Sequence, residues 1–362
     1  MTIMTATKNG LSTEFISHPG DTLLELLEQY GISQKELSLK TQTSEKHINE
    51  IIKGKKGITI SFAKKLENVF KPNATFWINR QTLYDEEIES IRIIENISED
   101  EKNITKHFPI KELVSYKYIQ EGNSDVENVL ILRKYCGVSN LLSINEVMNH
   151  LLYGVAFKKD ATSRSDDPYV LYSWLRMCQL ETESIYNPNS FDSKKLKSQL
   201  SNIKKLSKLG DINKAYKTTI EILYECGINY KMVRNFKGLS VQGYIKSVNN
   251  NFSLCTTLKY HREDVFWFTL FHEIGHLMSI RNTRAFVDER NDEDDANTFA
   301  RDYLINPSSY KKLLNHISEK TIIECAKEND ICPAIVVGRL ARENKIRYNQ
   351  FNNLVRTINW NN

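Results

Sequence analysis

The chain has 362 residues, with 49 Lys and Arg against 45 Asp and Glu, and a formal net charge of +4. Its composition of 40% hydrophobic and 26% charged residues excludes a disordered or collagen-like protein, and its length suits two or three domains. Only 14 Gly and 7 Pro occur, so helix breakers are scarce and we expect a mainly α fold. The small charge excess does not by itself indicate nucleic acid, because binding needs charge concentrated on one face.

Cysteine usage and hydropathy limit the cellular setting. The six cysteines form no C-x-x-C pair and no zinc-ribbon or disulfide spacing. The N-terminus lacks the apolar core of a signal peptide, and the longest uncharged apolar run, residues 265–271, is too short to span a membrane. We therefore expect a cytoplasmic protein with reduced thiols and no membrane association.

Residues 19–70 are patterned as four short helices. Ser33 and Glu36 predict a capping box, in which the hydroxyl accepts from the third amide and the carboxylate returns to the first. Ser44 is expected to cap the third helix, whose isoleucines point inward, and Gly54 to end it. Two short helices joined by a tight turn, the second with exposed polar residues, form a helix-turn-helix pattern.

The polar residues around that second helix are candidate DNA contacts, because they can read base edges or hold phosphates. The predicted contacts are Gln34, Ser44, Glu45, Lys46, His47, Asn49, Lys53 and Lys55, with Lys56 as a further phosphate candidate. Residues 33–71 hold nine Lys against four Glu, a local charge of +5. The alternative is a small helical bundle whose lysines only face solvent.

Four motifs in this region carry a resemblance to a known family. They are H-P-G at His18, S-Q-x-E-L at Ser33, G-K-x-G-I-T at Gly54 and F-W-x-N-x-Q-x-x-Y-D ending at Asp85. Residues 18–85 resemble the HigA-type antitoxins of the XRE helix-turn-helix family. The resemblance implies a DNA-binding domain over residues 14–85 and an antitoxin-like repressor. It further implies a homodimer on a palindromic double-stranded operator, with half-sites about 34 to 36 Å apart.

The middle of the chain offers little chemistry. Residues 86–199 are polar and helix-patterned, and we expect a helical connector without a site. Within it, residues 158–167 are expected to form an exposed loop or boundary.

A metal-binding motif follows at His272, Glu273 and His276, which form H-E-x-x-H in a stretch with helical spacing. Two histidines four residues apart lie on one helical face and can bind one Zn2+ ion. Between them, Glu273 is placed to accept a proton from water as general base.

A third ligand is expected one helix later. The acidic run at residues 288–295 leads into a helical pattern, and most of its carboxylates suit a solvated first turn. Glu293 differs, since it lies one turn before Asn297 and is placed as the third ligand, with Asn297 orienting a ligand. Ala296 and Ala300 would let this helix approach the H-E-x-x-H helix closely.

Two histidines, one glutamate and water form a hydrolytic zinc arrangement. Glu273 would take a proton from water and return it to the leaving amine, as peptide hydrolysis requires. The alternative, a zinc clip between two helices, has no use for that glutamate. The residue that stabilises the transition state stays open among Tyr303, Tyr310, His316 and Arg339.

Further motifs carry a second resemblance. H-E-I-G-H, E-x-x-A-N-x-F-A from Glu293, L-I-N-P ending at Pro307 and P-A-I-V-V-G-R-L from Pro333 resemble the ImmA/IrrE zinc metallopeptidases. The resemblance implies a gluzincin-like α+β domain over residues 200–362, ending in helices. Alternating residues 239–245 and 252–258 predict strands of a small sheet, whose edge can pair with an extended peptide.

Two functions remain open from the sequence. The first is a DNA-binding transcriptional regulator that carries a zinc endopeptidase, conditional or narrow in substrate, cleaving itself, a partner regulator or a toxin. The second is a non-enzymatic antitoxin or repressor whose zinc domain is a structural, dimerisation or sensing module.

Overall fold

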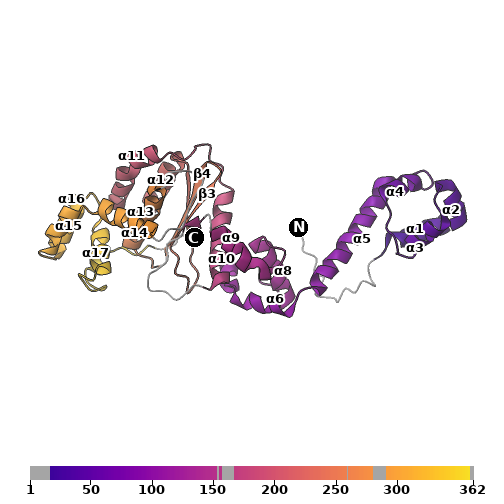
Figure 1. Cartoon of the computed structure of the whole chain (residues 1–362), viewed down its shortest axis with the longest axis horizontal. Helices are drawn as coiled ribbons and strands as arrows, with labels where there is room; N and C mark the ends of the chain where they lie inside the picture. The colour runs from indigo at the N-terminus through magenta and orange to yellow at the C-terminus, as the bar shows by residue number, and fades with distance from the viewer. Residues whose placement is uncertain (1–16, 153–154, 157–166, 259, 280–290, 359–362) are drawn as a thin grey trace. The chain divides into compact units, whose positions relative to one another are not determined.

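The computed structural model describes residues 17–152, 155–156, 167–258, 260–279 and 291–358. The chain divides into two compact units, which we call unit 1 (Met1–Lys102) and unit 2 (Asn103–Asn362). Both are rich in helices, and unit 2 contains a small sheet (Figure 1). The mainly α fold expected from the sequence is therefore confirmed. No helix among the described residues is long and apolar enough to span a membrane.

Unit 1 is built from short helices around one apolar core. Its helices are α1 (Pro19–Tyr30), α2 (Gln34–Thr41), α3 (Glu45–Ile52), α4 (Ile60–Glu67) and the longer α5 (Ala74–Glu95). Leu23, Leu37, Ile48, Leu66 and Trp77 are fully buried, one from each helix. Each supplies a hydrophobic anchor that fixes how α2 and α3 pack together.

The helix ends follow the sequence signals with one correction. The Ser44 hydroxyl accepts from the third amide of α3, and Gly54 adopts a left-handed conformation just after this helix. Ser33 likewise caps α2, but the predicted capping box is wrong in its second half. Glu36 pairs with Lys40 one turn later, at 3.2 Å, instead of returning to the first amide. That ion pair competes for the carboxylate.

The helix α5 continues past Asp85, where the sequence motif ends, as far as Glu95. A short helix, α6 (Glu99–Ile104), follows across the border between the two units. The division into residues 14–85, 86–199 and 200–362 stays a prediction, since contacts within the chain divide it only between Lys102 and Asn103.

Unit 2 surrounds a sheet of order β1-β3-β4-β2. Its strands are β1 (Val155–Ala156), β2 (Ile228–Val233), β3 (Gly243–Val248) and β4 (Asn251–Thr257). Strand β3 pairs antiparallel with both neighbours, whereas β2 pairs parallel with β4. After α6, the helices that precede β2 in the chain are α7 (Ile110–Ser115), α8 (Asp125–Cys136), α9 (Ile144–Leu152), α10 (Pro168–Glu183), α11 (Ser193–Lys205) and α12 (Ile212–Glu225).

The sheet differs from the sequence prediction in three ways. The first predicted strand begins at Gly243 rather than Leu239 and extends to Val248, because a two-residue loop with Asn249 at φ 56° closes a hairpin to β4. Strand β2 was not predicted. Strand β1 was not predicted either; it pairs with β3 at Ile245 and Lys246 and so forms one edge of the sheet. The predicted loop at residues 158–166 lies outside the described residues.

The helix α13 (Glu263–Ser279) lies at the centre of the unit 2 core. Several of its apolar side chains are fully buried, and they project from more than one side of the helix into the core. They are Trp267, Leu270, Phe271, Ile274 and Leu277. It packs against β3, β4 and α11, and against α14 (Asn291–Leu304) and α17 (Pro333–Arg342). In chain order, α15 (Pro307–Leu314) and α16 (Glu319–Glu328) come between α14 and α17. A helix buried in this way holds its polar side chains in fixed positions.

Candidate functional site

Two histidines project from the central helix α13 toward the same point. His272 and His276 lie one turn apart, and their side chains are 0% and 2% exposed. Their Nε2 atoms lie 3.0 Å apart. The i, i+4 spacing places both rings on one face of the helix, and the surrounding apolar core excludes alternative rotamers.

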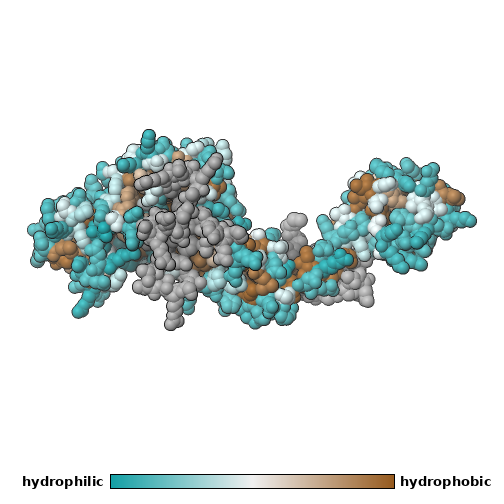
Figure 2. All heavy atoms as spheres, in the orientation of Figure 1, coloured by the Kyte–Doolittle hydropathy of each residue, from teal (hydrophilic) through white to brown (hydrophobic). Residues whose placement is uncertain are grey.

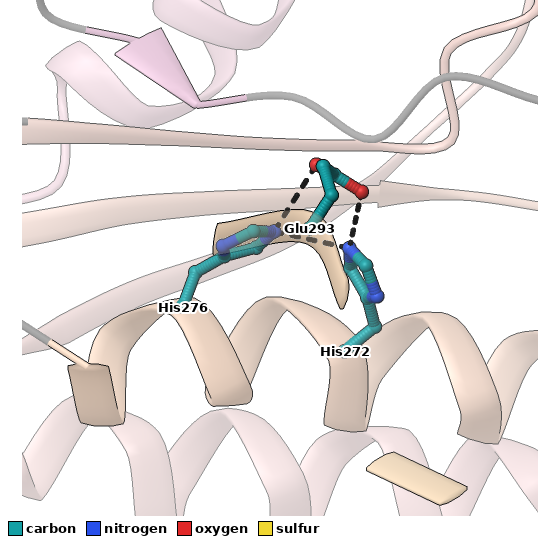
Figure 3. A group of neighbouring side chains, drawn as sticks. All are labelled: His272, His276 and Glu293. Atoms are coloured by element: carbon teal, nitrogen blue, oxygen red, sulfur yellow. Dashed lines mark hydrogen bonds and ion pairs between the residues drawn. The ribbon is translucent and has the colours of Figure 1, made fainter. Parts of the chain in front are cut away.

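The carboxylate of Glu293 on α14 completes this group (Figure 3). One of its oxygens lies 3.4 Å from Nε2 of His272, and the other lies 3.4 Å from Nε2 of His276. One donor atom from each residue falls within 4.8 Å of the others. The Glu293 side chain is 40% exposed, so the group is open to solvent on that side. The sequence prediction named these three residues as metal ligands, and the structure brings them together.

Small residues allow α14 to approach α13. A Cβ atom built on Gly275 would lie 3.1 Å from the Cα atom of Ala296, which is tighter than ordinary contact. Ala296 and Ala300 are fully buried. A larger side chain at any of these positions would separate the helices and move Glu293 away from the histidines.

Asn297 contacts the first histidine from the far side. Its Oδ1 accepts a hydrogen bond from Nδ1 of His272 at 3.0 Å. With the proton on Nδ1, the lone pair of the ring lies on Nε2, the atom that faces His276 and Glu293. Asn297 therefore selects the tautomer that a metal ligand needs, in the orienting role that the sequence predicted for it.

The charge state of Glu293 follows from the same contacts. Burial alone would raise the pKa of this carboxyl, but its close contact with the imidazoles of His272 and His276 outweighs burial and holds the pKa at about 2. The group therefore contains a carboxylate anion beside two imidazoles. This donor set, two nitrogen ligands and one oxygen ligand, fits a zinc ion with a remaining open position.

Glu273, the predicted general base, is fully buried and lies against the sheet. A Cβ atom built on Gly243, the first residue of β3, would lie 2.0 Å from a Glu273 carboxylate oxygen. Only glycine leaves room for this side chain. Sequence reasoning missed Gly243, and the one available signal was a glycine within the strand pattern.

The candidate transition-state residues have contacts of their own. The Tyr310 hydroxyl donates to Glu343 at 2.8 Å, and Arg339 contacts the same carboxylate at 3.0 Å. Arg339 also donates to the carbonyls of Arg301 and Ile305 at the end of α14. Tyr310 and Arg339 thus stabilise the helix that carries Glu293. Of the remaining two, Tyr303 stacks on Phe271 and Phe299, and His316 is exposed.

In unit 1, the candidate DNA contacts lie around α3. Ser44, Glu45 and Lys46 are exposed, whereas His47 and Asn49 are half-buried. The Ser44 hydroxyl accepts from the His47 amide at 3.3 Å, and the His47 ring meets Phe62 edge-on at 5.8 Å. Ser44 and His47 therefore have structural roles as well, whereas Glu45, Lys46 and Asn49 make no side-chain hydrogen bond in the described part of the chain and can reach a base edge.

The phosphate candidates flank this helix. Lys53 and Lys55 are exposed after α3, and Gln34 is half-buried at the start of α2. Lys56 pairs with Glu50 at 2.9 Å, so part of its charge is compensated.

Lys65, which sequence reasoning did not single out, donates to the Gln42 carbonyl at 3.3 Å and to Thr43 Oγ1 at 3.2 Å. These bonds hold the turn between α2 and α3.

Comparison with known proteins defines the class of unit 1. Residues 23–71 match the helix-turn-helix family model. The chain is 37% identical over 93 residues to Virulence-associated protein I of Dichelobacter nodosus, an alignment that covers 24% of this chain and 86% of that protein. Through its N-terminal unit, the chain belongs to the helix-turn-helix family.

Solved structures similar to the chain cover 19% and 23% of it. One is PA4674 of Pseudomonas aeruginosa in complex with its operator DNA, at 33% identity over 19% of this chain and 75% of that chain, with a TM-score of 0.19. Another is the Pseudomonas aeruginosa antitoxin HigA with the higBA promoter, at 28% identity over 23% of this chain and 97% of that chain, with a TM-score of 0.21.

Proposed function

We propose that the chain is a DNA-binding transcriptional regulator, an antitoxin-like repressor, that carries a zinc-dependent endopeptidase. The observation that carries the enzymatic part is the convergence of His272, His276 and Glu293 within 4.8 Å. The observation that carries the DNA part is the helix-turn-helix family of residues 23–71. We expect the protein to act in the cytoplasm, on an operator and on a protein substrate.

DNA binding would place α3 in the major groove of a double-stranded operator. Lys46 and Asn49 would contact base edges, while Lys53 and Lys55 would contact phosphates near the end of the helix. We propose that two copies of the chain bind a palindrome, since helix-turn-helix proteins read paired half-sites as dimers.

Peptide hydrolysis would occur at the buried group in unit 2. When bound there, zinc supplies a Lewis acid that acidifies water and polarises a carbonyl. His272, His276 and Glu293 would hold the ion, and Asn297 would keep His272 in the required tautomer. Glu273 would accept a proton from water and donate it to the departing amine. Gly243 leaves the space in which the Glu273 carboxylate lies.

The substrate that we propose is a protein of the same regulatory circuit: the chain itself, a partner regulator or a toxin. Cleavage would then change transcription from the operator. The competing function is a non-enzymatic repressor with a structural or sensing zinc site, and it predicts that Glu273 is dispensable.

The peptidase is tested by Glu273→Gln, which keeps the shape of the side chain and removes its basicity. Asp294→Asn is the matched control, because Asp294 is an exposed carboxylate on the helix that carries Glu293. Zinc content and the turnover of candidate substrates in cells are measured together. We expect Glu273→Gln to retain zinc and lose cleavage, while Asp294→Asn retains both. Full zinc with unchanged cleavage or unchanged transcription in Glu273→Gln would favour the non-enzymatic function.

The proposed recognition of operator bases by α3 is tested by a double variant that combines Lys46→Ala and Asn49→Ala. The control is Lys64→Ala on α4. An operator is first selected from random duplexes, and affinities for operator and scrambled duplex are compared. We expect the double variant to lose about ten-fold or more of its preference for operator, since base contacts contribute about 1 to 3 kcal/mol each. An unchanged preference would refute this assignment of α3.

A further inference from the structure

A second basic region lies in unit 2, far along the chain from the helix-turn-helix. Residues 193–217 contain eight lysines and one acidic residue, Asp211, for a net charge of +7. Residues 33–71 reach only +5 over a longer stretch. The basic region comprises α11, a 3-10 turn (Leu206–Leu209) and the first half of α12. The chain therefore carries its densest positive charge outside its helix-turn-helix unit.

The exposed lysines of α11 share one face of that helix. They are Lys194, Lys197 and Lys205, and their spacing places them within about 80° of each other around the axis at about 100° per residue. The opposite face carries Leu196 and Leu200, which are buried in the unit 2 core. The space-filling view shows mainly hydrophilic residues over the part of unit 2 where α11 lies (Figure 2).

Three lysines of the region have structural partners. Lys195 pairs with Glu225 at 3.3 Å, Lys208 pairs with Asp330 at 2.8 Å, and Lys204 donates to the Tyr303 carbonyl at 2.8 Å. The remaining five are exposed and form no ion pair with any residue in the described part of the chain; they are Lys194, Lys197, Lys205, Lys214 and Lys217. We call the three of them on α11, Lys194, Lys197 and Lys205, the lysine face. Like charges at this density repel one another, and an anionic partner would relieve that repulsion.

We propose that the lysine face binds the phosphate backbone of double-stranded DNA as a second, sequence-independent contact. This inference rests on the proposed DNA-binding function of unit 1. Because both surfaces belong to one chain, contact through one raises the effective concentration of DNA near the other. The lysine face then adds affinity without adding sequence preference.

The composition of the face favours duplex DNA over other polyanions and surfaces. Lysine is depleted in protein–protein interfaces, whereas phosphate contacts use lysine together with small polar donors. The neighbouring exposed residues on α11 are such donors: Ser198, Ser201 and Asn202. The helix α11 has no aromatic residue on which unpaired bases could stack. Its leucines are buried, so it cannot insert into a lipid surface.

The dimensions also agree. From Lys194 to Lys205 the helix rises by about 16 Å at about 1.5 Å per residue. A duplex carries roughly one phosphate charge per 1.7 Å of axis, so roughly ten phosphates lie along that length. Several lysines can therefore contact phosphates at the same time.

The test measures the salt dependence of duplex affinity for the full-length protein. The variant combines Lys194→Ala, Lys197→Ala and Lys205→Ala, and the matched control combines Lys311→Ala, Lys312→Ala and Lys320→Ala, three exposed lysines of α15 and α16. Alanine favours helix, so both variants should fold, and thermal unfolding checks this. We expect the α11 variant to lower the slope of log affinity against log salt by about 2.7 and affinity by roughly 10- to 100-fold at 0.15 M salt.

The two proposals fail in different ways. Preference for operator over scrambled duplex should be unchanged in the α11 variant, because the lysine face reads no bases. If the α11 variant has the slope of its control, the lysine face does not bind DNA, whatever unit 1 does. A wild type without operator preference would instead refute the proposed function of α3. Tighter binding to single-stranded RNA of equal length, lost in the α11 variant, would overturn duplex DNA as the partner.

Discussion

The metal group of unit 2 and the DNA-reading surface of unit 1 differ most in burial. His272 and His276 are almost fully buried, and two helices and a sheet fix where they point. Glu45 and Lys46 on α3 are exposed and can adopt many rotamers. Buried polar groups are costly unless partners satisfy them, so their convergence constrains function strongly. Exposed lysines can instead serve only to keep the protein soluble, so a DNA-binding role for each lysine needs its own test.

Removal of one buried imidazole should have the largest effect. We expect His276→Ala to weaken zinc binding by at least 1,000-fold, because only two protein ligands remain. The control is His316→Ala, which removes an exposed histidine of the same unit. Competition with a chromophoric chelator gives the affinities. Equal affinities in the two variants would remove the distinction between the buried group and an exposed histidine.

A methyl group at Gly243 should damage the site without touching a ligand. The Cβ atom would lie 2.0 Å from the Glu273 carboxylate and must displace it. A displacement of about 1 Å costs on the order of 100-fold in rate, while zinc affinity should stay within about two-fold of wild type. The comparison is with Lys246→Ala on the same strand. Full peptidase activity in Gly243→Ala would show that the contact between β3 and Glu273 has no functional role.

Loss of the orienting amide should have an intermediate effect. Asn297→Ala leaves the His272 Nδ1 without its acceptor at 3.0 Å, and we expect zinc affinity to fall by roughly 10- to 100-fold. Asn315→Ala, an exposed asparagine after α15, is the control. The same chelator competition measures both. If the two variants bind zinc equally well, the tautomer of His272 is set by another group.

The smallest effect is expected in unit 1. Ser44→Ala removes the hydroxyl that caps α3, and we expect the free energy of unfolding to fall by about 1 kcal/mol. The control is Ser61→Ala, an exposed serine on α4. Denaturant unfolding and duplex affinity are measured on the same samples. Lower affinity with unchanged stability would reassign Ser44 from a cap to a direct DNA contact.

These sites also differ in how far the sequence could predict them. Helix geometry is local, so the four-residue spacing of His272 and His276 was enough to predict that both side chains project from one face of the helix. The four-residue spacing of Glu293 and Asn297 predicted the same for that pair. The prediction of a capping box at Ser33 was wrong in its second half because Glu36 forms an ion pair with Lys40, one turn away. Local patterns cannot show which of two local partners a side chain takes.

Non-local features were the ones missed. The position of Gly243 against Glu273 depends on how β3 packs on α13, which no local pattern encodes. Strand β2 joins the sheet by parallel pairing with a strand that follows it by two elements. The two-residue β1 is too short for any alternation to mark it. Long-range packing decided each of these, and the sequence of a single chain does not display it.

We propose that one zinc ion lies among His272, His276 and Glu293, in the unit that follows the helix-turn-helix. X-ray absorption at the zinc edge of the purified full-length protein tests it most directly. We predict about one zinc per chain, with nitrogen and oxygen scatterers at about 2.0 to 2.2 Å that include two imidazole rings. Sulfur scatterers at about 2.3 Å, or a spectrum unchanged in His276→Ala, would contradict it.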